Sequence, residues 1–125
     1  WYDFIDKPAW TPPDQVFGPV WILLFILMAV AAWMVYSRRK SPERTLALTL
    51  FGVQLGLNLL WSYLFFSFEN PGLAFFELML MWFIIGITTI YFWHLRKAAG
   101  ILMLPYLAWV TFAAVLNFAI WRINL

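Results

Sequence analysis

Four long stretches of the chain carry almost no charged residues. They run over 18–36, 45–68, 73–93 and 98–121, and the first has no charge in 19 positions. At the helical rise of about 1.5 Å per residue, that first stretch is roughly 28 Å long, close to the thickness of a bilayer core. None of them alternates as a barrel strand does, so helices are needed to satisfy the backbone in lipid. We therefore predict an all-α integral membrane protein.

Composition supports this class and excludes several kinds of site. Hydrophobic residues fill 65% of the 125 positions and charged residues only 11%, against about 25% charged in an ordinary soluble domain. The absence of cysteine excludes disulfides, thiolate catalysis and cysteine metal sites, and a single histidine disfavours a histidine metal site. We predict no metal, no obligatory cofactor, no conventional catalytic constellation and no nucleic-acid partner.

Basic residues gather in alternate links between the spans. The links 37–44 and 94–97 hold six basic residues and one acid, whereas the segment 1–17, the link 69–72 and the carboxyl end hold two basic residues and four acids. The positive-inside rule then places 37–44 and 94–97 in the cytoplasm and 1–17 outside. Because the links are short, neighbouring helices are expected to be antiparallel. Residues 1–125 should form one domain in a multi-pass membrane protein, with a bacterial cell membrane as the expected location.

The first 17 residues differ in kind from the spans. Aromatic residues are mixed there with acids and with Pro8, Pro12 and Pro13. Prolines fix backbone torsions and so lower the entropy lost when a loop is ordered. We predict a structured lid over one end of the bundle. Because the chain opens with Trp1 rather than methionine, we also expect it to be part of a longer protein.

Polar side chains inside the second span share one helical face. Gln54, Asn58 and Trp61 follow one another at i, i+4 and i+7. Such amides either hydrogen-bond neighbouring helices as structural links or line a functional cavity. The structural interpretation is the more common one, and both stay open on spacing alone.

The fourth span carries a stripe of residues at four-residue spacing, Trp109, Ala113, Asn117 and Trp121. Trp121 stands beside Arg122 and fits an interface anchor, whereas Trp109 lies near the middle of its span, where the aromatic belt does not explain it. Nine tryptophans in 125 residues also exceed what such belts need. The small Ala113 leaves room for a pocket or for close helix packing.

A few other residues have simpler interpretations. Glu77 is the one formal charge inside a span, and its position near the outer end favours a side chain that reaches the interface or bonds to a loop. His94 fits an interfacial residue rather than a base. Gly52 and Gly56 form a weakly specific GxxxG, which is used for close helix contacts and for dimer faces.

Three segments, in order, resemble one known family. They are "WYDFIDKPAWTPPDQVFGPVW", "VQLGLNLLWSYLFF" and "LPYLAWVTFAAVLNFAIWRIN". Together they are similar to the tryptophan-rich sensory protein and translocator protein family, written TspO/MBR, over nearly the whole chain. The resemblance implies five transmembrane helices with a long loop after the first. This chain is similar to that loop followed by helices two to five.

The same resemblance implies a ligand cavity under the loop. Family members bind porphyrins such as protoporphyrin IX, and some bind sterols or synthetic aromatic ligands; bacterial relatives are associated with light-dependent porphyrin breakdown. A homodimer is expected. Sterol binding is in doubt because Phe118 replaces the tyrosine of the short sterol pattern. The family pattern assigns ligand binding to Tyr2, Trp10, Pro13, Trp21, Asn58, Trp61, Trp109 and Ala113.

The residues and the resemblance together lead to one main hypothesis. It is a membrane receptor or sensor that holds porphyrin, or a haem-related tetrapyrrole, in a cavity lined by tryptophan. Photochemical turnover, in which the excited porphyrin takes an electron from Trp21 or Trp109, would make those two residues catalytic. Two alternatives stay open: a small transporter of tetrapyrroles, sterols or other apolar metabolites, and a ligand-responsive regulatory subunit.

Overall fold

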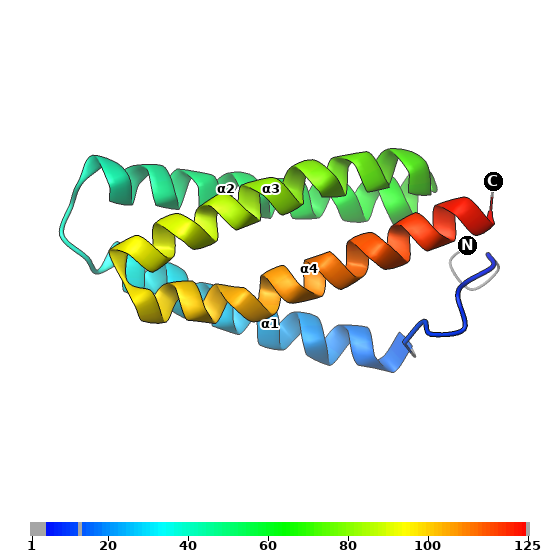
Figure 1. Cartoon of the computed structure of the whole chain (residues 1–125), viewed down its shortest axis with the longest axis horizontal. Coiled ribbons are helices and arrows are strands. Elements are labelled where there is room, and N and C mark those ends of the chain that lie inside the picture. The colour runs from blue at the N-terminus through cyan, green and yellow to red at the C-terminus, as the bar shows by residue number, and fades with distance from the viewer. Residues whose placement is uncertain (1–4, 13, 125) are drawn as a thin grey trace.

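The computed structural model describes residues 5–12 and 14–124, and helices make up nearly all of this part. Four helical segments are long and apolar enough to cross a membrane, which confirms the predicted all-α membrane bundle. The elements are α1 (Asp14–Tyr36), α2 (Pro42–Ser62), the short π-helix η2 (Tyr63–Ser67) that continues α2, α3 (Pro71–Leu95) and α4 (Lys97–Ile123) (Figure 1).

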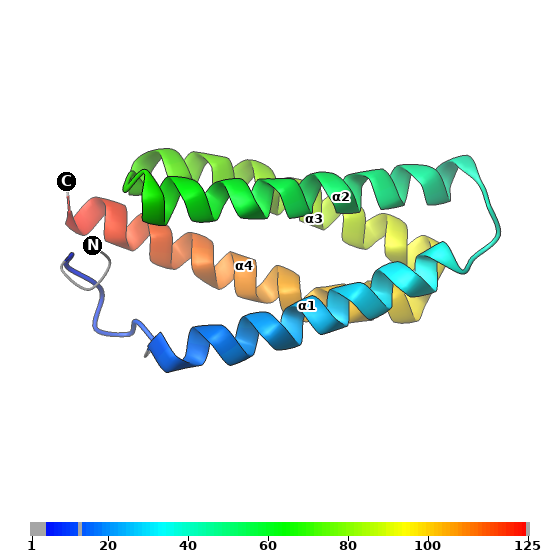
Figure 2. The ribbon, with the colours of Figure 1, turned by 180° about the vertical axis from the view of Figure 1, so that it is seen from behind.

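The long helices run antiparallel to their neighbours, with α3 and α4 at the centre of the packing (Figure 1). α3 packs along both α2 and α4, while α1 packs mainly on α4. α1 and α2 touch each other little. Figure 2 shows them diverging from the link between them towards the end of the bundle where the described chain begins and ends. At that end, α4 is seen between α1 and α2 in the view of Figure 2.

Capping residues explain where α2 and α3 begin. The Ser41 side-chain oxygen accepts a hydrogen bond of 3.1 Å from the backbone N–H three residues later, and Pro42 follows it. The Asn70 side-chain oxygen accepts one of 3.0 Å from Leu73, and Pro71 follows. A capping side chain followed by proline is a strong helix start, because proline lacks only an N–H that would be unpaired there. Both helices therefore begin two or three residues before the apolar spans predicted for them.

α1 begins at Asp14, four residues before the predicted span that starts at Gly18. The prediction that 1–17 is all loop is thus wrong for its last four residues. Hydropathy marks where lipid begins, but a helix can continue beyond the lipid. The correction moves Phe17 from the loop onto α1.

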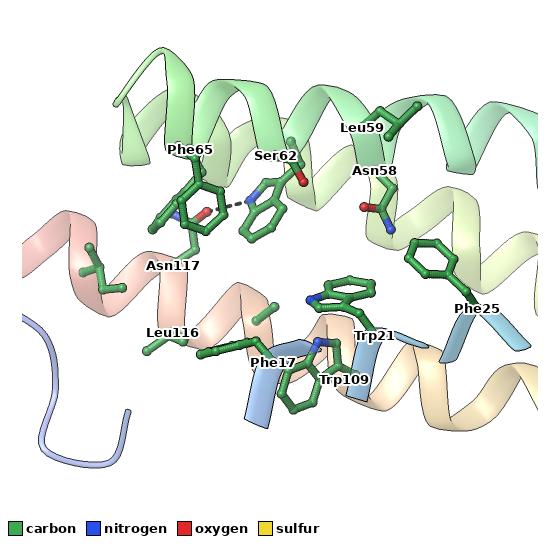
Figure 3. A pocket seen from close by; sticks show the side chains of 14 residues that line it. Phe17, Trp21, Phe25, Asn58, Leu59, Ser62, Phe65, Trp109, Leu116 and Asn117 are labelled. Atoms are coloured by element: carbon green, nitrogen blue, oxygen red, sulfur yellow. Dashed lines mark hydrogen bonds between the residues drawn. The ribbon is translucent and has the colours of Figure 1, made fainter. Parts of the chain in front are cut away.

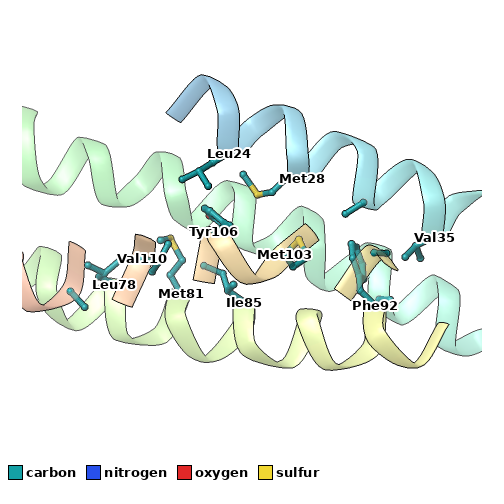
Figure 4. Close-up of a cluster of buried hydrophobic side chains, with 14 residues drawn as sticks. Leu24, Met28, Val35, Leu78, Met81, Ile85, Phe92, Met103, Tyr106 and Val110 are labelled. Atoms are coloured by element: carbon teal, nitrogen blue, oxygen red, sulfur yellow. The ribbon is translucent and has the colours of Figure 1, made fainter. Parts of the chain in front are cut away.

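The main hydrophobic core runs lengthwise between α1, α3 and α4 (Figure 4). Its larger buried side chains are Leu24, Met28, Val35, Leu78, Met81, Ile85, Phe92, Met103, Tyr106 and Val110. α2 contributes differently, because two of its three buried residues are the amides Gln54 and Asn58. α2 therefore meets the core with polar groups as well as apolar ones.

The amino-terminal segment lies against the carboxyl end of α4. The Asn124 amide joins it there twice: its oxygen accepts from the Asp6 N–H at 3.1 Å, and its nitrogen donates to the Asp6 carbonyl at 2.8 Å. Ile5 packs on the apolar cluster of that end, and the Trp10 ring meets Phe112 edge to face at 5.8 Å. Residues 5–12 are thus held against the carboxyl end of α4 and Phe112. Their role as a lid stays a prediction.

Candidate functional site: an aromatic cavity between α1, α2 and α4

A cavity of about 510 Å³ lies between α1, the end of α2 with η2, and α4 (Figure 3). Small-molecule sites usually enclose about 300–1,000 Å³. Its wall is mostly aromatic and aliphatic, with a few polar side chains. The lining residues are Phe17, Trp21 and Phe25 from α1; Asn58, Leu59, Trp61, Ser62, Phe65 and Phe66 from α2 and η2; and Trp109, Ala113, Leu116, Asn117 and Ile120 from α4.

Trp21 and Trp109 form an aromatic corner on one side of the cavity. Their ring centroids are 6.4 Å apart and their planes nearly perpendicular, at 88°. Phe17 meets Trp109 edge to face at 5.8 Å, and Phe25 lies 5.7 Å from Trp21 in a tilted arrangement. Edge-to-face pairs of this kind are favourable because the positive ring edge meets the negative ring face. The corner therefore has fixed faces on which a flat ligand can stack.

Trp61 belongs to the wall that α2 forms, across the cavity from α1, and it is held by hydrogen bonds. Its indole N–H donates to the Asn117 side-chain oxygen at 2.9 Å, and the Asn117 amide nitrogen donates to the Pro71 carbonyl at 2.8 Å. The Trp61 ring also stacks on Phe65 at 5.4 Å. Because its N–H is already engaged, Trp61 offers a ligand its aromatic surface rather than a hydrogen bond.

The π-helix η2 shapes the same wall. Phe65 and Phe66 are consecutive residues of η2, yet both line the cavity and both rings contact Trp61, at 5.4 and 6.0 Å. A π-helical turn holds an extra residue relative to an α-helix and is frequent at functional sites. The irregular turn thus adds two phenylalanine rings to one aromatic wall.

A chain of buried hydrogen bonds connects the cavity with the core. The Asn58 amide nitrogen donates to the Tyr106 hydroxyl at 2.9 Å, and that hydroxyl donates to the Gln54 side-chain oxygen at 2.7 Å. The Gln54 nitrogen donates in turn to the Met28 sulfur at 3.8 Å. The amides of α2 therefore bond to neighbouring helices, as the structural interpretation of their spacing predicts. Asn58 also borders the cavity.

Comparison with known proteins fits this architecture. The sequence profile of the TspO/MBR family matches residues 1–122. The chain belongs to the TspO/MBR family. It is 41% identical to "Tryptophan-rich protein TspO" of Chlorobaculum tepidum, covering 99% of this chain and 79% of the relative. It is 39% identical to the protein of the same name from Archaeoglobus fulgidus, covering 99% of this chain and 80% of the relative. It is 35% identical to "Translocator protein" of Sus scrofa, covering 99% of this chain and 75% of the relative.

The cavity of this TspO/MBR chain brings together five residues that the family pattern singles out. Trp21, Asn58, Trp61, Trp109 and Ala113 all lie on its wall, although they come from three helices. Their role in binding stays a prediction.

The three remaining residues of that pattern are placed differently. Trp10 does not line the cavity; it is 49% exposed, and its ring packs edge to face on Phe112. Tyr2 and Pro13 lie outside the described residues. No residue of 5–12 lines the cavity, so the predicted contribution of the loop to binding stays a prediction.

Sequence reasoning did not predict any of the four phenylalanines that line the cavity. Phe17, Trp21 and Phe25 follow one another at four-residue intervals, a spacing that puts them on one helical face. Hydropathy alone places Phe17 in the loop before the first span, which hides the pattern, and among thirteen phenylalanines no single one stands out. Asn117, noted only as part of the α4 stripe, has a clear role because it orients Trp61.

The prediction for Glu77 is wrong. Its two carboxyl oxygens are buried, and neither has a hydrogen-bond partner among the described residues. The side chain therefore neither reaches the interface nor bonds to a loop. Helical spacing explains this outcome, because Glu77 follows the buried Ala74 and precedes the buried Met81 on the same face of α3.

Two further features of the spans concern helix packing. Trp121 lies against α3, where a Cβ added to Gly72 would be 2.7 Å from its indole nitrogen. Gly52 and Gly56 are exposed on α2, and a Cβ added to either would meet no atom within 4 Å. Within the described chain this GxxxG holds no helix contact, so the expected homodimer stays a prediction.

Proposed function

We propose that this TspO/MBR protein is a membrane receptor or sensor that binds a porphyrin, such as protoporphyrin IX, in the aromatic cavity. The observation that carries the proposal is the convergence of Trp21, Trp61 and Trp109, from three different helices, on a single space of about 510 Å³. A porphyrin is a large, flat, mostly apolar disc with two carboxylates. Flat aromatic surfaces on opposite walls suit the disc.

The polar groups of the wall suit the rest of such a ligand. Asn58 and Ser62 offer hydrogen bonds within the cavity, and the described lining contains no charged side chain. An anionic group is costly to bury without a partner. We therefore expect the porphyrin carboxylates to stay at the mouth, towards the end of the bundle covered by residues 5–12.

The contact between Trp21 and Trp109 supports a photochemical extension of the proposal. Two indoles with centroids 6.4 Å apart stand beside the same ligand space, so either is placed to give an electron to an excited porphyrin. The orientation with 37–44 and 94–97 in the cytoplasm, and the bacterial membrane, remain parts of the proposal that rest on charge distribution.

Titration of the protein with protoporphyrin IX, followed by the shift of the porphyrin absorption band, tests this function. The double variant Trp21→Phe, Trp109→Phe is expected to bind about tenfold more weakly in the dark, a loss of about 1.4 kcal/mol in all, because two phenyl rings offer less stacking surface than two indoles. Under illumination at matched occupancy, the wild-type protein is expected to bleach the bound porphyrin, and the double variant to bleach it far more slowly.

Trp33→Phe is the matched control, since Trp33 lies on α1 with 63% of its surface exposed. It should bind and bleach as the wild type does. Equal affinity in the wild type and the double variant would refute the proposed pocket. Equal bleaching in light and dark would refute the photochemical extension and leave binding intact. Porphyrin flux into sealed proteoliposomes would favour the transporter alternative instead.

A further inference from the structure

Four buried side chains form a hydrogen-bond chain that has a direction. It starts at the Met28 sulfur, passes through Gln54 and the Tyr106 hydroxyl, and ends at Asn58 on the cavity wall, over contacts of 3.8, 2.7 and 2.9 Å. Each of the four is at most 6% exposed. Because these side chains are buried, water is excluded as an alternative partner for most of their polar atoms. Each hydrogen-bond donor must therefore face an acceptor on the neighbouring side chain.

The direction is fixed at the methionine end. A thioether sulfur accepts hydrogen bonds but cannot donate one. The NH₂ group of Gln54 therefore turns towards Met28, and its oxygen turns towards Tyr106. Because a carbonyl oxygen only accepts, the Tyr106 proton points to Gln54, and the hydroxyl oxygen is left to accept from Asn58. The reversed chain would place the Gln54 oxygen against the sulfur, two acceptors facing each other in a buried site.

The consequence appears on the cavity wall. One N–H of the Asn58 amide is engaged by Tyr106. Figure 3 shows the amide oxygen turned towards the cavity that Trp21 also lines. An asparagine amide has nearly the same shape in either orientation, so without the chain it would present an acceptor or a donor equally well. The chain turns the acceptor oxygen of Asn58, rather than its NH₂ group, towards the cavity.

We propose that Met28, acting through Gln54 and Tyr106, sets the orientation of Asn58 and so makes the cavity select ligands that carry an N–H or O–H donor at this point. Met28, Gln54 and Tyr106 are positioning residues, and Asn58 is the group that touches the ligand. This inference rests on the proposed function of the cavity as a binding site. It adds a chemical requirement that a flat apolar shape alone does not impose.

Two isosteric flat probes test the requirement. Carbazole carries a ring N–H, whereas dibenzofuran has an ether oxygen at the same position. Quenching of tryptophan fluorescence is measured for both probes in the purified protein. The wild-type protein is expected to prefer carbazole by about tenfold, the usual effect of one hydrogen bond to an otherwise unpaired buried group.

Met28→Leu keeps the volume but removes the acceptor, and it should reduce the preference to within about threefold, because both orientations of Gln54 and Asn58 become available. Tyr106→Phe should do the same by cutting the chain, and it serves as the second variant if Met28→Leu lowers stability. Met34→Leu is the matched control, since Met34 is a half-buried methionine of the same helix and takes no part in the chain. It should keep the wild-type preference.

The outcomes separate the inference from the proposed function. Equal binding of the two probes by the wild type, or an unchanged preference in both Met28→Leu and Tyr106→Phe, overturns the orienting role while the cavity remains a binding site. If the wild-type protein binds neither carbazole nor dibenzofuran, both the orienting role and the cavity's role as a binding site are overturned. A preference that is lost in Met28→Leu and Tyr106→Phe and kept in Met34→Leu supports the inference, because a general loss of packing would weaken both probes alike.

Discussion

Replacement of Ala113 by phenylalanine is expected to weaken protoporphyrin IX binding by about 100-fold or more. Ala113 lies on α4 between Trp109 and Asn117, one helical turn from each, and all three line the cavity. A benzyl group added there occupies space that the ligand needs, between walls that aromatic contacts and the Asn117 hydrogen bonds hold in place. The porphyrin absorption shift measures the loss.

The same substitution at Ala108 is the control. Ala108 belongs to the same helix but is exposed and does not line the cavity. Ala108→Phe should bind porphyrin with wild-type affinity, and both variants should unfold at temperatures close to that of the wild type. If Ala113→Phe bound porphyrin as tightly as Ala108→Phe does, the ligand would have to lie elsewhere.

Gly100→Ala is expected to cause the largest loss of stability among single-methyl changes, at least about 1–3 kcal/mol. α3 ends at Leu95 and α4 begins at Lys97, so the chain reverses over one residue and Gly100 comes to lie directly on Trp93. A Cβ on Gly100 would be 2.7 Å from the Trp93 Cα, a backbone atom that cannot move without shifting the helix. Thermal unfolding in detergent measures the change.

Gly86→Ala provides the comparison within the same pair of helices. A Cβ at Gly86, in the interior of α3, would meet nothing within 4 Å. Alanine there should stabilise the helix by up to about 1 kcal/mol, because glycine is the poorer helix former. If both variants lost stability equally, the close approach of Gly100 to Trp93 would not be what holds this turn.

The spans were predictable because hydropathy and length depend on local sequence alone. Their ends were predicted less well: Ser41 with Pro42 and Asn70 with Pro71 start helices ahead of the apolar stretches. The π-helix at Tyr63–Ser67 left no recognisable signal in an aromatic run. Its effect depends on stacking between Trp61 and Phe65, a contact that exists only once the helices have packed.

The cavity was predictable only in part, for a similar reason. Spacing showed that Asn58 and Trp61 share a face and that Trp109 and Ala113 share another, but not that these two faces meet Trp21 across one space. That depends on the order in which helices pack, with α1 on α4 and away from α2. Only the family resemblance grouped these residues into one site. No sequence pattern marked Met28 and Tyr106 as hydrogen-bond partners of the α2 amides.

Determination of the structure with protoporphyrin IX bound tests most directly whether the aromatic cavity is the binding site. We predict that the ring lies between Trp21, Trp61 and Trp109, with its carboxylates towards the end of the bundle covered by residues 5–12. A second space of about 450 Å³, a groove between α3 and α4 bordered by Trp82 and Phe118, offers a clear alternative. Porphyrin bound in that groove, with the aromatic cavity empty, would contradict the proposed function.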